Sequence, residues 1–245
     1  MKRKLLTVLL LLAPAWAIAA GGSHGLDKAN IDPNNRESQQ RGASLFVNYC
    51  LSCHSAELMR YERIGKDLGI NEKMLKENLI FTGGKVGDLM TVATADADAK
   101  EWFGTVPPDL TVIARSRGVD WLYTYMRSFY RDDSKLIGVN NLVFPDVGMP
   151  HVMWELQGWQ EAVTTTVKDP DGTEREMVKL ELVEPGLLSP KEYDRAVRDL
   201  VNFLDYMGEP AKYERQHLGV KVIMFLLVLL VLAILMKKDF WKDVH

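Results

Sequence analysis

Two apolar runs, one near each end of the chain, stand out from the mixed pattern of polar and hydrophobic positions between them. Near the N-terminus, basic residues at positions 2–4 precede an apolar run over residues 5–13, and small residues follow at 15, 17, 19 and 20. This order is typical of a secretory signal peptide. A membrane anchor is the alternative, but the run is short and ends at Pro14. We predict that residues 1–20 are a signal peptide and that the following chain is exported.

The second run extends from Leu218 to Met236 and is interrupted only by Gly219 and Lys221. Its length of nineteen residues, at ~1.5 Å per residue, nearly spans the ~30 Å hydrocarbon core of a bilayer. Because the run has no polar face, a buried helix of a soluble protein is disfavoured. We predict a transmembrane anchor at residues 217–237 and a cytoplasmic tail at 238–245. Basic residues flank the run equally, so this orientation rests on the signal peptide.

The region between the two runs, residues 21–216, has the length of one domain and a mainly helical pattern. Its clearest helix begins at the capping box Ser189–Glu192, with Pro190 in the first turn, and ends at Gly208. The apolar stripe of this helix is formed by Tyr193, Val197, Leu200, Leu204 and Met207. Further helices are predicted from about Glu37 to the segment 50–54, and over 74–81, 110–117 and 120–130.

A small β-hairpin interrupts this helical pattern. Residues 163–167 and 177–182 alternate like strands on either side of the turn sequence Asp169–Gly172. Residues 21–35 are polar and predict an extended arm, whereas residues 91–100 and 144–153 predict surface loops. The expected fold class is therefore mainly α, with a hairpin insertion and one C-terminal transmembrane helix.

Charge narrows the range of partners. The whole chain of 245 residues has a formal net charge of −3, and residues 21–216 alone carry 23 basic and 31 acidic residues, a net charge of −8. Such a surface disfavours nucleic acid and anionic membrane surfaces and favours a cationic partner. Ordinary solubility explains the same charge equally well.

The candidate chemistry lies in Cys50-Leu51-Ser52-Cys53-His54, which contains the two cysteines of the chain. Two thiols three residues apart on one helical face can both reach the vinyl groups of one porphyrin, and the next histidine can ligate the iron. A disulfide, a thioredoxin-like pair and a zinc site are the alternatives. The redox pair requires a βαβ context, and zinc requires four ligands, which are both lacking here. We predict one haem c attached through Cys50 and Cys53, with His54 as an axial ligand.

A protein side chain at the sixth coordination position of the haem iron makes an electron carrier, whereas an open position allows chemistry on a bound small molecule. Met74, Met126 and Met207 lie at predicted helical positions, where methionine usually fills the core. Met149 instead lies in a loop between Gly148 and Pro150. His151 and Met153 lie close by, so the residues alone leave the choice among the three open.

Several segments together resemble one family. The motif Cys50–His54, the segment Pro107–Leu110 with Arg117 behind it, the loop Gly148–Pro150, the capped helix and the C-terminal anchor occur in the order of the cytochrome c1 family. These proteins are the haem subunits of ubiquinol–cytochrome c reductase, the cytochrome bc1 complex, here in a bacterial form. Glycine at position 42, four residues before Phe46, also resembles soluble c-type cytochromes, in which the first and last helices cross closely at glycine.

The resemblance implies His54 and Met149 as axial ligands, Pro108 packed on the haem and Arg117 near a haem propionate. It implies a c-type cytochrome haem domain that takes one electron from the Rieske iron–sulfur protein and passes it to a cytochrome c, without bond chemistry of its own. Cytochrome b and the lipid bilayer are further partners, within a dimeric complex of the bacterial inner membrane, and the haem domain lies on the periplasmic side. Where relatives have a tyrosine near the haem, this chain has Trp121, so that contact is not carried over.

Two other functions fit parts of the pattern. A membrane-anchored c-type cytochrome of a terminal oxidase would share the haem motif and the anchor. A haem peroxidase would share the motif but leave the sixth iron position open. Co-purification with a Rieske protein would distinguish the bc1 subunit from the oxidase cytochrome. Binding of CO or cyanide to the native protein would reveal a peroxidase.

Overall fold

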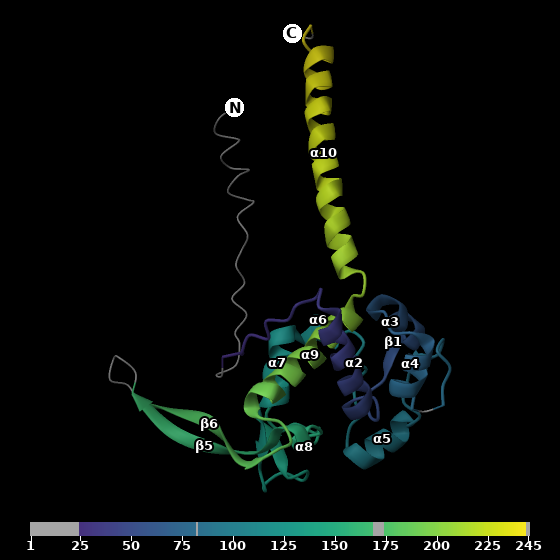
Figure 1. Cartoon of the computed structure of the whole chain (residues 1–245). Helices are drawn as coiled ribbons and strands as arrows, with labels where there is room; N and C mark the ends of the chain where they lie inside the picture. Colours follow the sequence, from purple (N-terminus) through teal and green to yellow (C-terminus); the bar gives the residue numbers. More distant parts are fainter. Residues whose placement is uncertain (1–24, 82, 169–173, 244–245) are drawn as a thin grey trace.

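The computed structural model describes residues 25–81, 83–168 and 174–243, so the predicted signal peptide lies outside it (Figure 1). The described chain is mainly helical, as predicted, and it also contains small two-stranded antiparallel sheets. The helices are α2 (Arg36–Tyr49), α3 (Tyr61–Leu68), α4 (Glu72–Asn78), α5 (Asp96–Phe103), α6 (Ile113–Arg117), α7 (Val119–Arg127), α8 (Trp154–Gln157), α9 (Pro190–Gly208) and α10 (Lys212–Phe240). The strands are β1 (Ala56–Arg60), β2 (Leu89–Met90), β3 (Phe129–Arg131), β4 (Val139–Asn141), β5 (Gly158–Lys168) and β6 (Glu174–Pro185).

Helices α2 and α9 pack closely against each other at the centre of the domain (Figure 1). At the crossing, a Cβ atom on Gly42 would lie 2.1 Å from the carbonyl oxygen of Asp199, so only glycine permits this approach. One turn further along, the rings of Phe46 and Phe203 lie 5.6 Å apart and are fully buried. The close crossing expected from the position of Gly42 is confirmed.

Polar contacts complete the same crossing. The hydroxyl of Ser38 donates to Asp199 Oδ1 at 2.6 Å, and Arg41 donates to both carboxylate oxygens of Asp199. Asn202 donates to Ser38 Oγ at 3.0 Å. Because Asp199 is buried, these donors supply the partners that a carboxylate needs inside a protein.

The residues before α2 form an extended arm that lies along α7. Lys28 and the amide of Ala29 both donate to the carboxylate of Asp120, at 2.7 and 2.9 Å. The guanidinium of Arg127 donates to Asp27 on the arm and to Asp194 on α9, each at 2.5 Å. The arm, α7 and α9 are therefore joined by charged hydrogen bonds.

The predicted strand pair is present and longer than the alternation indicated. Strands β5 and β6 pair antiparallel from Gly158 opposite Pro185 to Lys168 opposite Glu174, and they extend away from the helices (Figure 1). The predicted turn at residues 169–172 lies outside the described residues.

Helix α9 follows its sequence pattern closely, with both halves of the Ser189–Glu192 capping box formed. Other predicted boundaries are wrong. The predicted loop over residues 91–100 contains the start of α5, and the predicted helix over 120–130 ends at Arg127 and is followed by β3. The pairs β1–β2 and β3–β4 were not expected.

Helix α10 extends alone beyond the rest of the molecule (Figure 1). Within the described residues, the stretch Glu214–Phe240 is the one helix long and apolar enough to cross a membrane. Its large apolar side chains are exposed over its whole length, as in a helix whose solvent is lipid. This helix contains the predicted anchor, residues 217–237.

Candidate haem-binding site

The two cysteines lie where α2 ends. Cys50 is the C-terminal cap of the helix, and the amides of Cys53 and His54 both donate to its carbonyl oxygen, at 3.1 and 2.9 Å. The motif therefore occupies one tight turn after the helix rather than the helix itself. The thiols are not joined in a disulfide. Burial raises the pKa of the Cys50 thiol to about 12, whereas Cys53 is partly exposed.

His54 is oriented by a backbone carbonyl. Its Nδ1 lies 2.7 Å from the carbonyl oxygen of Pro108, which can only accept a hydrogen bond, so Nδ1 carries the proton. The other ring nitrogen then keeps its lone pair, which is the form that ligates a metal. Burial lowers the pKa of His54 and keeps the ring neutral, although the Pro108 contact opposes this effect.

The segment Pro107–Leu110 lies against the motif through a ladder of hydrogen bonds. The amide of Leu110 donates to the carbonyl of Ser55 at 2.9 Å, and the amide of Glu57 donates to the Asp109 carboxylate at 2.7 Å. Because each proline restricts φ, the carbonyl of Pro108 is held in a stiff frame. Two predicted site residues, His54 and Pro108, are thus in direct contact.

Met149 lies in the loop after β4, half-buried against the core. The hydroxyl of Tyr125 on α7 donates to its sulfur at 3.4 Å. Burial raises the pKa of Tyr125 above its usual range, so the hydroxyl stays protonated and can donate. The sequence did not reveal this contact, because Tyr125 and Met149 lie 24 positions apart.

The two rival ligands are buried in the core. Met153 is fully buried. The ring of His151 stacks on Phe129 at 5.0 Å and meets Trp159 edge-on at 5.8 Å, and burial lowers its pKa to about 4. Neither ring nitrogen of His151 makes a hydrogen bond of good geometry. The side chain of Gln157 nevertheless lies close enough to offset part of the decrease in the pKa of His151. Of the three candidates in this loop, Met149 is the most accessible.

Arg117 ends α6 with its guanidinium over aromatic rings. It lies 5.1 Å from the centre of the Trp121 ring and 5.8 Å from that of Phe144. Trp121 in turn stacks on Tyr125 at 4.9 Å, so Arg117 belongs to the same aromatic group as the partner of Met149. Among the described residues no carboxylate pairs with Arg117, whose donors remain available to an anionic ligand group.

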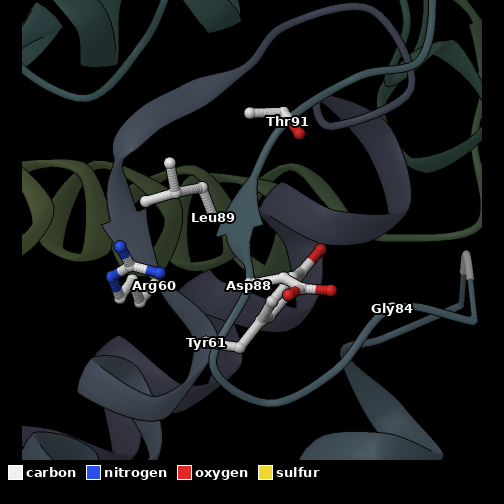
Figure 2. Close-up of a pocket in the computed structure, with 6 residues that line it drawn as sticks. All are labelled: Arg60, Tyr61, Gly84, Asp88, Leu89 and Thr91. Atoms are coloured by element: carbon white, nitrogen blue, oxygen red, sulfur yellow. The ribbon is translucent and has the colours of Figure 1, made fainter.

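A surface pocket of about 400 Å³ lies elsewhere, between β1, β2 and the start of α3 (Figure 2). It is lined by Arg60, Tyr61, Gly84, Asp88, Leu89 and Thr91. In Figure 2, Tyr61 and Asp88 lie beside each other, and Leu89 lies between Arg60 and Thr91. None of the predicted haem residues lines this pocket, so it is not part of the candidate site.

The donor set fits haem c and not the alternatives. Two free thiols three residues apart, a histidine with one nitrogen available and a loop methionine are the groups that attach and ligate such a haem. Zinc has no support, because no cluster of three or more His, Cys, Asp or Glu side chains occurs within residues 25–81, 83–168 and 174–243.

Comparison with known proteins decides the family. The model of the "Cytochrome C1 family" matches residues 80–244, which is well over half of the chain. A curated relative from Allochromatium vinosum, named "Cytochrome c1", is 53% identical over 245 residues, with all of both chains covered. The chain belongs to the cytochrome c1 family.

Two further relatives extend this result. "Cytochrome c1" of Rhodospirillum rubrum is 25% identical, with 96% of each chain covered. A Nitrosomonas europaea protein named "Ammonia monooxygenase gamma subunit" is 49% identical, with 99% of this chain and 98% of that protein covered. Members of the cytochrome c1 family are membrane-anchored, haem c-containing electron-transfer subunits of the bc1 complex, which also contains cytochrome b and a Rieske protein. This chain is therefore such a subunit.

Proposed function

We propose that the chain holds one haem c through thioethers to Cys50 and Cys53, with His54 and Met149 as axial ligands. The hydrogen bond between His54 Nδ1 and the Pro108 carbonyl carries this proposal, because it prepares the imidazole as a ligand. Pro108 packs against the haem. The guanidinium of Arg117, held over Trp121, would bind a propionate through donors that no described carboxylate occupies.

When bound, haem c supplies a one-electron couple between ferric and ferrous iron. The residues of this chain hold and tune it. Partial burial lowers the pKa of His54 and favours its neutral form, and a thioether ligand such as that of Met149 would favour the ferrous state and raise the potential. Because His54 and Met149 would both bind the iron, no position would be left for O₂ or peroxide, and the chain would perform no bond chemistry of its own.

The electron route that these properties support begins at the Rieske iron–sulfur protein and ends at a cytochrome c. Residues 21–216 form the haem domain on the periplasmic side, residues 217–237 the anchor and residues 238–245 the cytoplasmic tail, within a dimeric complex. The acidic side chains of α5, Asp96, Asp98 and Glu101, are exposed just before the segment that contacts His54. They favour a basic acceptor.

Haem attachment is tested by replacing the thiols. In Cys50→Ala/Cys53→Ala, haem should no longer remain on the polypeptide after denaturation, and the peroxidase stain of the denatured band should disappear. Ser52→Ala is the matched control, because Ser52 lies between the thiols, and it should keep the stain. Stain that persists in the double cysteine variant would refute covalent attachment.

The electron route is tested by its partners. Mild detergent extraction with a tag on this chain should recover cytochrome b and the Rieske protein together with it. Recovery of a terminal oxidase, or of ammonia monooxygenase subunits as the name of the N. europaea relative implies for that protein, would contradict the route. CO binding by the native reduced protein would instead favour an open sixth position and a peroxidase-like activity.

A further inference from the structure

The hydroxyl of Tyr125 has a fixed position beside the sulfur of Met149. The Tyr125 ring stacks on Trp121 with an interplanar angle of 10° and meets Phe129 edge-on at 5.1 Å. Rings on two sides leave the side chain little rotational freedom, so the hydroxyl remains directed at the thioether 3.4 Å away. A thioether accepts hydrogen bonds only weakly, and such a contact persists where the surrounding structure imposes it.

One asparagine joins the backbone of Tyr125 to the start of the loop that carries Met149. Asn141, which is 1% exposed, donates through Nδ2 to the carbonyl oxygen of Tyr125 at 2.8 Å. Its Oδ1 accepts from the amides of Val143 and Phe144, at 2.9 and 3.1 Å, where the loop that carries Met149 begins. The end of α7 and the start of this loop are therefore tied to the same side chain, which keeps hydroxyl and sulfur in register.

We propose that Tyr125 is a positioning residue for the iron ligand Met149 and that its hydrogen bond raises the reduction potential. A thioether sulfur has two lone pairs, so one can face a metal while the other accepts from the hydroxyl. The hydrogen bond draws electron density from the sulfur. Ferric iron depends on that density more than ferrous iron does, so the contact favours the reduced state. This inference rests on the proposed ligation by Met149.

Tyr125→Phe removes the hydroxyl and keeps the ring stack. We expect the variant to keep its covalent haem and its methionine–iron charge-transfer band. Its equilibrium constant for reduction should fall about 3- to 10-fold, a downward shift of about 30–60 mV at 59 mV per tenfold change. Site-specific 3-fluorotyrosine at position 125, a stronger hydrogen-bond donor, should move the potential upward. Redox titration of the purified full-length protein measures both shifts.

Tyr123→Phe is the matched control. Tyr123 is a buried tyrosine of the same helix, but its ring packs under Arg127 and Arg198 and not beside Met149. The reduction potential of the Tyr123→Phe protein should equal that of the wild type. An unshifted potential in Tyr125→Phe, or an equal shift in Tyr123→Phe, would overturn the inference.

Met149→Leu separates this inference from the assignment beneath it. If Met149→Leu loses the methionine–iron band while Tyr125→Phe leaves the potential unchanged, Met149 is the ligand and only the role of Tyr125 is refuted. If Met149→Leu keeps the band, the proposed ligation fails, and the inference about Tyr125 fails with it.

Discussion

Replacement of Gly42 by alanine should force α2 and α9 apart at the centre of the domain. The added Cβ atom would lie 2.1 Å from the carbonyl oxygen of Asp199 and 2.7 Å from Phe203 Cβ. The first obstacle is helix backbone, which cannot rotate away as a flexible side chain can. The two helices must therefore shift, which also lengthens the 2.6 Å hydrogen bond between Ser38 and Asp199.

The cost follows from opposing contributions. Overpacking of a tight core costs about 1–3 kcal/mol and occasionally more. A weakened hydrogen bond to the buried carboxylate adds about 1.5–3 kcal/mol, whereas alanine gains about 1 kcal/mol over glycine in helix propensity. We expect a net loss of about 2–4 kcal/mol in the free energy of unfolding, which lowers the melting temperature by about 5–15 °C for a domain of this size.

Thermal unfolding of the purified protein, followed by far-ultraviolet circular dichroism, measures this loss. Gly87→Ala is the matched control, because a Cβ atom there meets nothing within 4 Å, and its melting temperature should stay close to that of the wild type. A Gly42→Ala protein as stable as the control would refute the close helix crossing.

Three further outcomes are expected. Lys28 and the amide of Ala29 lower the pKa of Asp120, so the stability that these contacts give the arm is present above about pH 4 and is lost as the pH falls further. The hydrogen-exchange protection of the Ala29 amide should decrease over the same pH range. Asp120→Asn should abolish this pH dependence. A chain that ends after Gln216 should carry haem and appear in the soluble periplasmic fraction, and its retention in membranes of cells lacking the other subunits would refute a single anchor. Electron transfer to a soluble basic cytochrome c, measured below saturation, should slow as salt shortens the Debye length from ~10 Å at 0.1 M to ~3 Å at 1 M. Neutralising the acidic side chains of α5 should weaken that salt dependence, whereas a rate independent of salt would refute electrostatic attraction.

Local signals in the sequence predicted the elements that local interactions stabilise. The Ser189–Glu192 capping box and the stripe of α9 lie within a few residues of each other, so their pattern alone indicates the helix. Strict alternation likewise indicated β5 and β6. The start of α5 was missed because Ala95, at its N-cap, offers no side-chain oxygen and the helix buries only Ala99.

Contacts between distant segments could not be predicted in this way. The helix predicted over residues 120–130 ends at Arg127 because Asn141 and Ser128 take the carbonyl of Tyr125, which a continued helix would use. The contact of His54 with Pro108 joins residues 54 positions apart, and the sequence did not indicate it; the family resemblance implied only that Pro108 packs on the haem. The haem motif itself was visible because its chemistry requires neighbouring residues.

The most direct test of the proposed site is the ferric absorption spectrum of Met149→Leu. The wild-type protein should show the weak methionine–iron charge-transfer band, and Met149→Leu should lose this band while keeping covalent haem. Met153→Leu, a change of similar volume at a fully buried methionine of the same loop, should keep the band. An unchanged band in Met149→Leu would contradict ligation by Met149 and assign the sixth position to another residue.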